Sequence, residues 1–559
     1  MFISNLGQKR SFLLFCLGTA VISLSLAIVI LAAVPPVSKD ALVHHLAVPK
    51  LYLKAGSMYE IPSMPYSYYP MNLQLLYLVA LSLGSDIASK FIHFAFAVMT
   101  SLALFGYLSR RISRVWGLLG ALLFLSVPIV IKLSIIAYVD LVVVFFVFGA
   151  LLSILAWMQS SFKVRYLLVS AVLCGLALGT KYNALIALFI LTSLVPLIYI
   201  RKTKASRSRS LKAIGCGLLF FSVSLLVFSP WMIRNYSWTG NPIHPLYQHW
   251  FQGSGKGLDG AVSGGAGPRE VNYGVFTYRR VVYGESGWEI ALLPVRIFFE
   301  GRDGDPRYFD GKLHPFLLLL PLFAFLRPRR DLVDLHRQEK FLLLTFSILF
   351  FALAFFSQGL RVRYIAPIIP PLVILSVFGL RNIVLWIRGT PSRWLRISAA
   401  VSSGAVMLIF VAYSVDYLIE QFRYVQPLSY LSGKVDREAY ITRYRPEYPV
   451  IKYANQNLSQ EAKILLVFMG RRGYYLDRDY VPGVDRLGKL FLDSDSPEEA
   501  LRALRQDSIS HLLVYIPILD RWAGDNLGGE RQEIMRRFFK DHTRSLCFHQ
   551  GYALHALVR

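Results

Sequence analysis

Residues 11–56 read SFLLFCLGTAVISLSLAIVILAAVPPVSKDALVHHLAVPKLYLKAG, and this stretch decides the class of the fold. Its first part, residues 11–34, is an apolar run long enough to cross about 30 Å of hydrocarbon. The run ends at a Pro-Pro pair without a small-residue cleavage site, so we expect a first membrane span and not a signal peptide. The polar stretch that follows contains Asp40, His44 and His45. Against a membrane surface, such an acid is costly to keep and useful mainly for chemistry.

The composition of the whole chain is that of a polytopic membrane protein. The 559 residues are 55% hydrophobic and only 17% charged, and their mean hydropathy is +0.47, too apolar for a soluble globule of this length. The formal net charge of +26 would suit a nucleic-acid partner. However, the Lys and Arg residues fall mostly in short clusters between apolar runs, which is typical of membrane topology signals, so we expect no nucleic-acid binding. The four cysteines show no CxxC or metal-ligand spacing.

About eleven apolar segments are long enough to cross a bilayer, at about twenty residues each. They lie near residues 12–34, 86–108, 115–133, 139–158, 166–180, 183–200, 213–233, 313–327, 341–357, 364–380 and 396–416. The basic clusters between them all fall on one side of the membrane, which by the positive-inside rule is the cytoplasm. The sequence therefore predicts an α-helical polytopic protein in a bacterial inner membrane, with a cytoplasmic N-terminus.

This orientation places four parts of the chain on the extracytoplasmic side. They are a first loop at residues 35–85, a long loop at residues 234–312, the short turn SQGLRVR at residues 357–363, and everything after about residue 417. We expect a membrane domain at residues 1–416 and a separate domain at residues 417–559. In the latter, EYPVIKYANQNLSQEAKILLVFMG predicts a helix and a buried strand, and SPEEALRALRQDSISHLLVYI predicts a capped helix and another strand. This alternation favours a small α/β domain with a parallel or mixed sheet.

Two acids are candidates for catalysis. Asp40 precedes His44 by one helical turn, so both side chains can face one space. Asp140 begins the fourth span, where nothing in the following apolar stretch could neutralise it. A helix cap for Asp40 and an interfacial anchor for Asp140 are the simpler interpretations. Two acids that converge on one membrane face favour a site.

Three cations lie at span ends. Lys181 is flanked by apolar residues in GLALGTKYNALIALF, where it either extends to water or binds a lipid phosphate. Arg361 and Arg363 lie in the turn RVRY on the predicted outer side, against the general trend of charge. Guanidinium groups bind phosphate bidentately, so the pair suits an anionic lipid headgroup, although arginines at span ends also serve as anchors.

Further candidates lie in the two outer loops. Glu60 and Tyr69 in the first loop and His244 in the long loop could line a sugar or metal site together with His44 and His45. Aromatic belts at membrane interfaces explain the tyrosines equally well. A divalent metal ion is an open alternative, since no local spacing specifies its ligands.

The order of these features resembles the GT-C superfamily of membrane glycosyltransferases, in the bacterial branch related to protein O-mannosyltransferases and aminoarabinose transferase. The matching stretches are KDALVHHLAVPKLYLKAG, YSYYP, AYVD, GLALGTKY, RNYSWTGNPIHP and RVRYIAPIIPP, spread over residues 1–380. Two departures stand out. Ala41 follows Asp40 where many relatives have Glu, and the nearest stretch to the oligosaccharyltransferase WWD signature, residues 522–525, lacks the paired Trp.

The resemblance implies a function. It implies Asp40 as catalytic acid/base with Asp140 as its partner, and Lys181 with Arg361 or Arg363 as ligands of a donor phosphate. The hypothesis is transfer of a sugar from a polyprenyl-phosphate donor to a lipid, glycan or protein acceptor on the extracytoplasmic face. The competing hypothesis is a transporter or flippase of a lipid-linked or anionic solute, which predicts midplane charges and inverted repeats. A third, an assembly protein with a membrane anchor, does not need about eleven spans.

Overall fold

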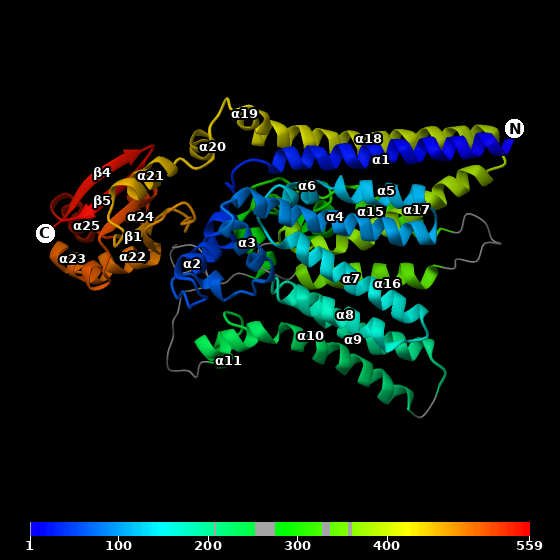
Figure 1. Ribbon diagram of the computed structural model, residues 1–559, viewed down its shortest axis with the longest axis horizontal. Helices are drawn as coiled ribbons and strands as arrows, with labels where there is room; N and C mark the ends of the chain where they lie inside the picture. The colour runs from blue at the N-terminus through cyan, green and yellow to red at the C-terminus, as the bar shows by residue number, and fades with distance from the viewer. Residues whose placement is uncertain (1, 206–207, 252–273, 327–335, 356–359, 559) are drawn as a thin grey trace.

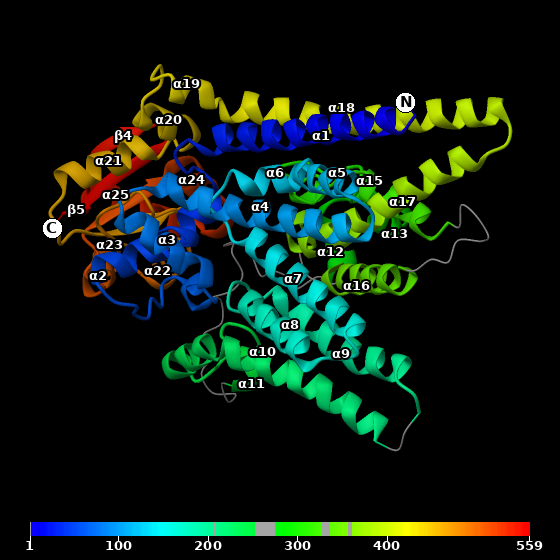
Figure 2. The ribbon, with the colours of Figure 1, turned by 45° about the vertical axis from the view of Figure 1, so that its right-hand side comes forward.

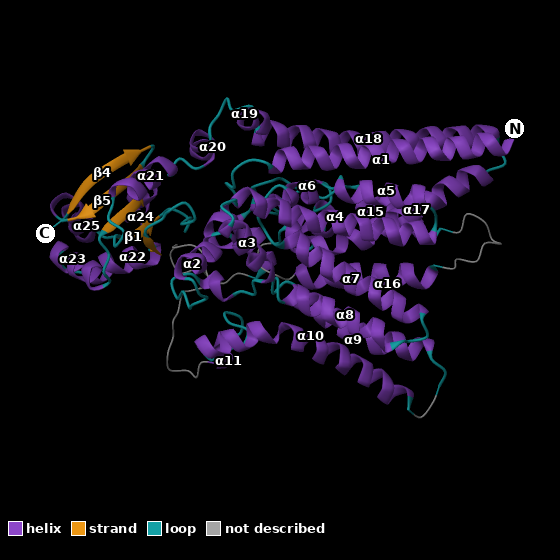
Figure 3. Cartoon of the chain, viewed as in Figure 1, coloured by secondary structure: helices purple, strands orange, loops and turns teal. Residues whose placement is uncertain are grey.

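The computed structural model describes residues 2–205, 208–251, 274–326, 336–355 and 360–558. Figure 1 shows long helices that run in roughly one direction, with all the strands gathered at one end of them. The N-terminus lies at the opposite end (Figure 1). We call the end of the helical bundle that carries the strands the sheet side. Figure 3 separates the two parts by secondary structure.

Eight helices in the described part of the chain are long and apolar enough to cross a membrane. They are residues Arg10–Ala32 of α1 (Phe2–Ala32), α4 (Asp86–Arg111), α7 (Asp140–Gln159), α9 (Ala184–Lys202), α10 (Arg209–Thr239), α16 (Arg337–Phe355), the segment Ala366–Gly389 with α17 (Ile369–Gly389), and α18 (Arg393–Val425). α1 and α18 lie side by side at one edge of the bundle (Figure 1).

The remaining predicted spans take other forms. The segment predicted at 115–133 is not one straight helix but a pair, α5 (Arg114–Leu125) and α6 (Pro128–Ser134), bent by 69°. Pro128 explains the break, because a proline disfavours helical geometry in the residue before it, and Val127 is extended. The predictions at 166–180 and 313–327 correspond to shorter apolar helices, α8 (Val164–Leu178) and α15 (Phe316–Leu322) with η4 (Phe323–Phe325). The count of about eleven spans stays a prediction.

Shorter elements connect the spans and lie mostly on the sheet side. They are η1 (Ala41–His45), α2 (Ala47–Ala55), η2 (Pro65–Tyr68), α3 (Asn72–Ser82), α11 (Gln248–Phe251), α12 (Val275–Val282), α13 (Gly287–Ala291), α14 (Leu293–Arg296), η3 (Pro306–Tyr308), η5 (Val362–Tyr364), η6 (Ala366–Ile368), α19 (Pro427–Leu431) and α20 (Arg437–Tyr444). α10 continues to Thr239, beyond the predicted start of the long loop at 234. Residues 252–273 of that loop, and the basic cluster at 327–330, lie outside the described residues.

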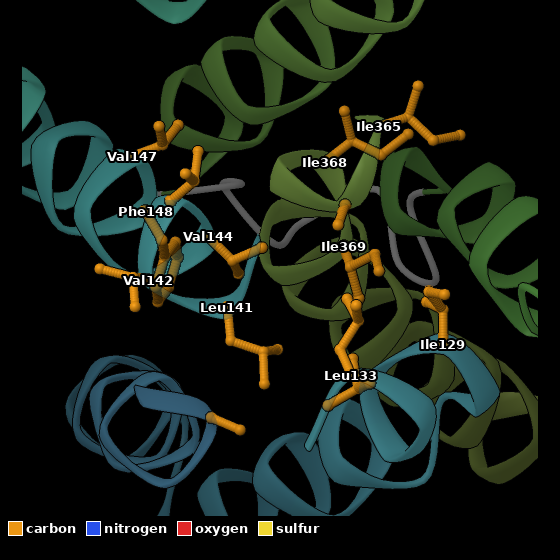
Figure 4. Packing of buried hydrophobic residues seen from close by; sticks show 14 of the residues in the cluster. Ile129, Leu133, Leu141, Val142, Val144, Val147, Phe148, Ile365, Ile368 and Ile369 are labelled. Carbon is orange, nitrogen blue, oxygen red and sulfur yellow. The ribbon is translucent and has the colours of Figure 1, made fainter. Parts of the chain in front are cut away.

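A dry apolar core supports the sheet-side end of the bundle. Figure 4 shows Leu141, Val144 and Phe148 of α7 facing Ile368 and Ile369 at the start of α17, with Leu133 of α6 beside them. These side chains are almost completely buried. Close packing here fixes the starts of α7 and α17, which carry or adjoin the candidate charged residues.

The C-terminal part holds a five-stranded mixed sheet of order β2-β1-β3-β5-β4. Its strands are β1 (Lys463–Val467), β2 (Asp479–Pro482), β3 (His511–Tyr515), β4 (Thr543–His549) and β5 (Tyr552–Leu557). β1 pairs in parallel with β2 and β3, whereas β5 is antiparallel to β3 and β4. The prediction of a small α/β unit with a parallel or mixed sheet is confirmed.

Helices cover both faces of this sheet. Leu465 and Val467 of β1 pack under α22 (Val484–Asp493), α23 (Pro497–Gln506), α24 (Ile516–Asn526) and α25 (Gly529–Asp541). The alternate residues Ile464 and Leu466 face α21 (Tyr448–Asn457) on the other side. This follows from the period of two in a strand and explains why β1 reads as a continuous apolar run. The predicted helix cap is Ser496, whose hydroxyl accepts from the amide of Glu499.

Candidate active site

A cavity of about 830 Å³ lies on the sheet side, where the helical bundle meets the C-terminal sheet. Its walls come from segments far apart in the sequence: the first loop, the starts of α3 and α7, the link between α8 and α9, the turn before α17, and the C-terminal part. The lining residues that bear on chemistry are Lys39, Asp40, His44, His45, Tyr66, Tyr69, Gln74, Lys181, Arg361, Arg363, Tyr364 and Arg471.

Asp40 forms an ion pair across the cavity wall. Its Oδ2 accepts from Nη1 of Arg363 at 2.7 Å. The carboxylate makes no capping hydrogen bond to η1, so the helix-cap interpretation does not describe it. Burial opposes ionisation of this carboxyl group, but the charge of Arg363, with smaller contributions from His44 and Lys181, lowers the pKa of Asp40 to about 2. Asp40 is therefore fully ionised near neutral pH.

Asp140 forms the second ion pair. It is the first residue of α7 and almost completely buried, and its Oδ1 accepts from Nζ of Lys181 at 2.6 Å. Its Oδ2 is buried without a hydrogen-bond partner. Lys181 therefore does more than extend to water: it balances a buried acid at the wall of the cavity.

A histidine absent from the sequence-based candidates supports the start of α7. Nε2 of His93, on α4, accepts from the amide of Leu141 at 3.0 Å, and its other ring nitrogen donates to the carbonyl of Ile136 at 2.9 Å. These bonds satisfy backbone groups on either side of Asp140 and hold that residue in position. In the sequence, the only indication of this role of His93 was a histidine within an apolar helix.

Two tyrosines join the ion pairs into one cluster. The guanidinium of Arg363 lies 5.2 Å from the ring centre of Tyr138 and 5.3 Å from that of Tyr364, and Lys181 Nζ lies 5.0 Å from the Tyr364 ring. The hydroxyl of Tyr138 also accepts from the amide of Asp40 at 3.3 Å. Both tyrosines adjoin predicted residues in AYVD and RVRY, yet nothing in the sequence indicates that their rings meet.

Arg361 lines the same cavity but is held differently. Its side chain is partly exposed. Nη1 of Arg361 lies 3.6 Å from Oδ2 of Asp310, at the end of the long loop. Arg363, by contrast, is almost completely buried. Of the two predicted arginines, Arg361 has the weaker partner and the freer side chain.

The two adjacent histidines have different surroundings. His44 stacks on Tyr66 with ring centres 4.7 Å apart, and its Nδ1 has no hydrogen-bond partner. Burial, opposed by the charge of Asp40, lowers the pKa of His44 to about 4, so this ring is neutral near pH 7. The ring of His45 is fixed by Gln74, whose Nε2 lies 3.1 Å from Nδ1. Tyr69 lines the cavity and packs edge-on against Tyr66.

Glu60 and His244 are not among the residues that line this cavity. Instead they meet at Tyr68, whose hydroxyl donates to Glu60 Oε1 at 2.7 Å and whose ring lies 4.5 Å from that of His244. No group of three or more His, Cys, Asp and Glu residues that could hold a metal ion occurs in the described part of the chain. The carboxylates of Asp40 and Asp140 are bound instead by a guanidinium and an ammonium group.

The C-terminal part supplies one wall of the cavity, a role that sequence reasoning did not assign. Phe468, Gly470 and Arg471 follow β1, Val484 follows β2, and Ile518 follows β3. These three strands are parallel, so their carboxyl ends meet at one edge of the sheet, the usual place for a ligand in sheets of this kind. The sequence did contain one indication of this role: GRRG, a pair of arginines flanked by glycines, follows a buried strand.

Known proteins share this arrangement of helices and sheet. The crystal structure of ArnT from Cupriavidus metallidurans in the apo state superposes with a TM-score of 0.53 over 99% of this chain and 98% of that chain, at 13% identity. The chain has the GT-C fold. ArnT from the same organism bound to undecaprenyl phosphate gives a TM-score of 0.53 at 14% identity, over 96% of this chain and 97% of that one. The Archaeoglobus fulgidus oligosaccharyltransferase in the apo form superposes with a TM-score of 0.50 at 12% identity. The superposition covers 89% of this chain and 69% of that chain.

The sequence itself matches one family. Residues 70–233 match the family model described as dolichyl-phosphate-mannose-protein mannosyltransferase. No curated protein matches the sequence. The matched segment spans α3 to α10 and includes Asp140 and Lys181. Together with the fold, this match makes the chain similar to the GT-C membrane glycosyltransferases, the same similarity that the motifs in the sequence indicate.

Proposed function

We propose that this protein transfers a sugar from a polyprenyl-phosphate-linked donor to a lipid, glycan or protein acceptor. The observation that carries the proposal is the pairing of Asp40 with Arg363 and of Asp140 with Lys181 around one cavity of about 830 Å³. Asp40, Lys181 and Arg363 line this cavity and Asp140 is buried behind Lys181, so one carboxylate is available as a base and two cations are available to bind an anion. The solved relative ArnT bound to undecaprenyl phosphate supports a polyprenyl-phosphate carrier.

We place the reaction on the extracytoplasmic face of a bacterial inner membrane, with the N-terminus in the cytoplasm. The cavity lies on the sheet side, whereas Arg110 and Arg111 at the end of α4 and Arg201 and Lys202 at the end of α9 lie at the other ends of their helices. By the positive-inside rule those basic ends face the cytoplasm. Nucleotide sugars are confined to the cytoplasm, so a lipid-linked donor fits a cavity on the opposite face.

The donor phosphate would bind Arg363, Lys181 and Arg361. Arg361 has only a 3.6 Å contact with Asp310 and can turn to the phosphate with little loss. A phosphate that draws Arg363 away from Asp40 also changes the basicity of the Asp40 carboxylate. The pKa of Asp40 is about 2 because of Arg363, which makes the paired carboxylate a weak base. Donor binding would therefore make Asp40 more basic when the substrate is present.

In the transfer step, Asp40 takes the proton from the acceptor hydroxyl as that oxygen attacks the anomeric carbon of the donor. The bond from the anomeric carbon to the phosphate oxygen breaks, and its electron pair leaves with the polyprenyl phosphate. Lys181 and the arginines stabilise the charge that develops on this leaving group. Direct displacement from the opposite face gives inversion at the anomeric carbon.

The test compares envelope lipids and glycans, by mass spectrometry, from cells that carry the wild-type protein, no protein, or Asp40→Asn. We expect one sugar modification to be lost without the protein and to fall by about 10²–10⁴-fold in Asp40→Asn, because a general base contributes that much. The purified variant should still bind undecaprenyl phosphate, which shows that it folds. If cells with Asp40→Asn made as much product as wild-type cells, Asp40 would not be the base. If cells without the protein lost no sugar modification, the proposed function would be wrong.

A further inference from the structure

A second polar cavity, of about 720 Å³, lies apart from the active-site cavity and shares no lining residue with it. It is bounded by α13, α14, the following loop and α18. Its polar lining includes Arg296, Arg302, Arg307, Tyr308, Lys312 and Tyr413. Four basic residues in one cavity on the sheet side are an exception to the positive-inside pattern.

Two of these four cations already have carboxylate partners. Arg296 binds Glu300 at 2.8 Å and Glu285 at 3.3 Å, and Lys312 binds Glu420 at 2.5 Å. The other acid in the wall, Glu289, is held by the hydroxyl and amide of Ser286 at 2.8 Å each. These acids are therefore committed to other groups.

Arg302 and Arg307 have no carboxylate within ion-pair distance among the described residues. Both pack on one ring: the Arg302 guanidinium lies 4.2 Å and that of Arg307 5.6 Å from the ring centre of Tyr308. Nε of Arg307 is buried without a hydrogen-bond partner. Two guanidinium groups beside one tyrosine, one of them with a buried donor that makes no hydrogen bond, form a site suited to an anion.

The backbone holds this pair in place. The amide of Arg302 donates to the carbonyl of Tyr308 at 2.9 Å, and the amide of Gly311 donates to the carbonyl of Arg302 at 2.9 Å. The carbonyl of Arg307 accepts from the buried side chain of Arg279 at 2.8 Å. The two guanidinium groups are thus carried by an ordered loop, so little conformational entropy would be lost when they bind a ligand.

An exposed apolar stripe lies beside the cavity. Exposed apolar side chains follow one another at helical spacing from α13 through α14 to the residues just after it, with Trp288 73% and Phe299 46% exposed and Leu292 and Val295 between them. Such a stripe suits a segment that lies in the membrane interface. On α18, Tyr413 lies about one turn before Asp416, the first acid after the apolar run of that helix.

We infer that this cavity binds the phosphate of an anionic membrane lipid, in the leaflet on the sheet side. Arg302 and Arg307 contact the phosphate oxygens, and the acyl chains lie along the apolar stripe of α13 and α14. Guanidinium groups match phosphate geometry, and the exposed apolar residues explain why a lipid and not a free ion is the ligand. The site is separate from the donor phosphate site proposed at Lys181, Arg361 and Arg363, and it does not depend on the proposed transfer reaction.

The same loop connects the site to the active-site cavity. Asp310, three residues after Arg307, contacts Lys132 at 3.3 Å and Arg361 at 3.6 Å, and Arg361 lines the active-site cavity. A lipid bound to Arg302 and Arg307 would therefore be held by the same loop that carries the partner of Arg361.

The test uses the full-length protein, purified in an uncharged detergent and titrated with phosphatidylglycerol, with bound lipid counted by native mass spectrometry. We expect the variant Arg302→Gln/Arg307→Gln to bind phosphatidylglycerol about a hundredfold more weakly than wild type, since two charge-assisted contacts are lost and each contributes about tenfold. The charge-matched control Arg280→Gln/Arg423→Gln, which removes two exposed cations outside the cavity, should bind as wild type does. Arg363→Gln should also leave this binding unchanged.

Five outcomes contradict the inference. Equal binding by wild type and Arg302→Gln/Arg307→Gln would remove the cavity as the site. An equal loss in the control pair would show only general attraction to surface charge. A loss in Arg363→Gln would place the lipid in the active-site cavity. If phosphatidylcholine bound with the same affinity as phosphatidylglycerol, the ligand would not be an anionic lipid. Full displacement of the lipid by millimolar inorganic phosphate would also rule out an anionic lipid as the ligand.

Discussion

At Asp40, two opposing effects act on one carboxyl group. Burial disfavours the charged form, and Arg363 at 2.7 Å favours it more strongly, so the pKa falls from 3.8 to about 2. The sequence was sufficient to nominate Asp40, Asp140, Lys181 and the pair Arg361 and Arg363 as candidates, because charges at span ends are costly and few. It could not select Tyr138, Tyr364 or His93, because polar aromatic residues at membrane interfaces have ordinary structural roles as well.

Replacing Arg363 by Gln should change how stability depends on pH. The folded-state pKa of Asp40 lies below its unfolded value, so the ion pair stabilises the protein above about pH 4. This stability is lost as the pH falls through about 2. Wild type should therefore exceed Arg363→Gln in thermal unfolding temperature by the largest margin near neutral pH, and the margin should shrink as the medium is acidified. His44, whose pKa is also lowered, contributes to both proteins and largely cancels in the difference.

The same variant should move the acid limb of the activity profile. Without Arg363, the effect of burial on Asp40 is opposed only by the smaller effects of His44 and Lys181, so the pKa of Asp40 rises and kcat/KM should begin to fall at a higher pH than in wild type. Arg280→Gln removes one exposed cation elsewhere and serves as the control. Activity profiles and stability curves that run parallel in wild type and Arg363→Gln would contradict the coupling of the two side chains.

At the scale of the elements, the distance to which two helix backbones can approach decides how those helices pack. Gly175 on α8 lies against α10, and a Cβ built at this glycine would be 2.6 Å from the carbonyl oxygen of Ser224 and 2.6 Å from Cβ of Val227. The hydroxyl of Ser224 donates to the carbonyl of Ala171 across the same interface. Helix type and approximate limits follow from apolar run length, but the break between α5 and α6 shows that one proline within a run can redirect a helix.

Gly175→Ala should therefore destabilise the bundle. Atoms at 2.6 Å must separate, and overpacking of this kind costs about 1–3 kcal/mol. We expect a lower thermal unfolding midpoint for the purified protein in detergent. Gly215→Ala on α10 is the matched control, because a Cβ there meets nothing within 4 Å. An equal midpoint for Gly175→Ala and wild type would show that α8 and α10 adjust without cost.

For the whole molecule, the C-terminal part and the first loop form one unit around the cavity. Nζ of Lys50, on α2, donates to Asp477 at 2.7 Å and to the carbonyls of Tyr474 and Leu476 at 2.8 and 3.1 Å. Arg437 on α20 binds Asp86, at the start of α4, at 2.5 Å. These bonds hold the carboxyl ends of β1, β2 and β3 over the cavity. The division of the chain at residue 416 stays a prediction, and α18 continues to Val425.

Arg471 is the residue that best tests this role of the sheet. It lines the cavity from the sheet side and is distant in sequence from the residues assigned to the donor phosphate. We expect Arg471→Gln to lower the amount of sugar product in cells by about tenfold, the loss of one charge-assisted contact, while the affinity of the purified protein for undecaprenyl phosphate stays unchanged. Arg502→Gln, an exposed change on α23, is the control. A parallel loss of undecaprenyl phosphate binding would assign Arg471 to the donor instead.

The sequence by itself determined the membrane class, the position and type of most helices, the C-terminal α/β unit and the charged residues that the helical bundle brings to the cavity: Asp40, Asp140, Lys181, Arg361 and Arg363. These follow from apolar run length, residue periodicity and the cost of charge near lipid, which are properties of neighbouring residues in the chain. Only the tertiary structure decided that Arg363 pairs with Asp40, that Glu60 and His244 lie outside the cavity lining, and that three strand ends close it. Those contacts join residues up to several hundred positions apart, and their distance and direction depend on how whole elements pack.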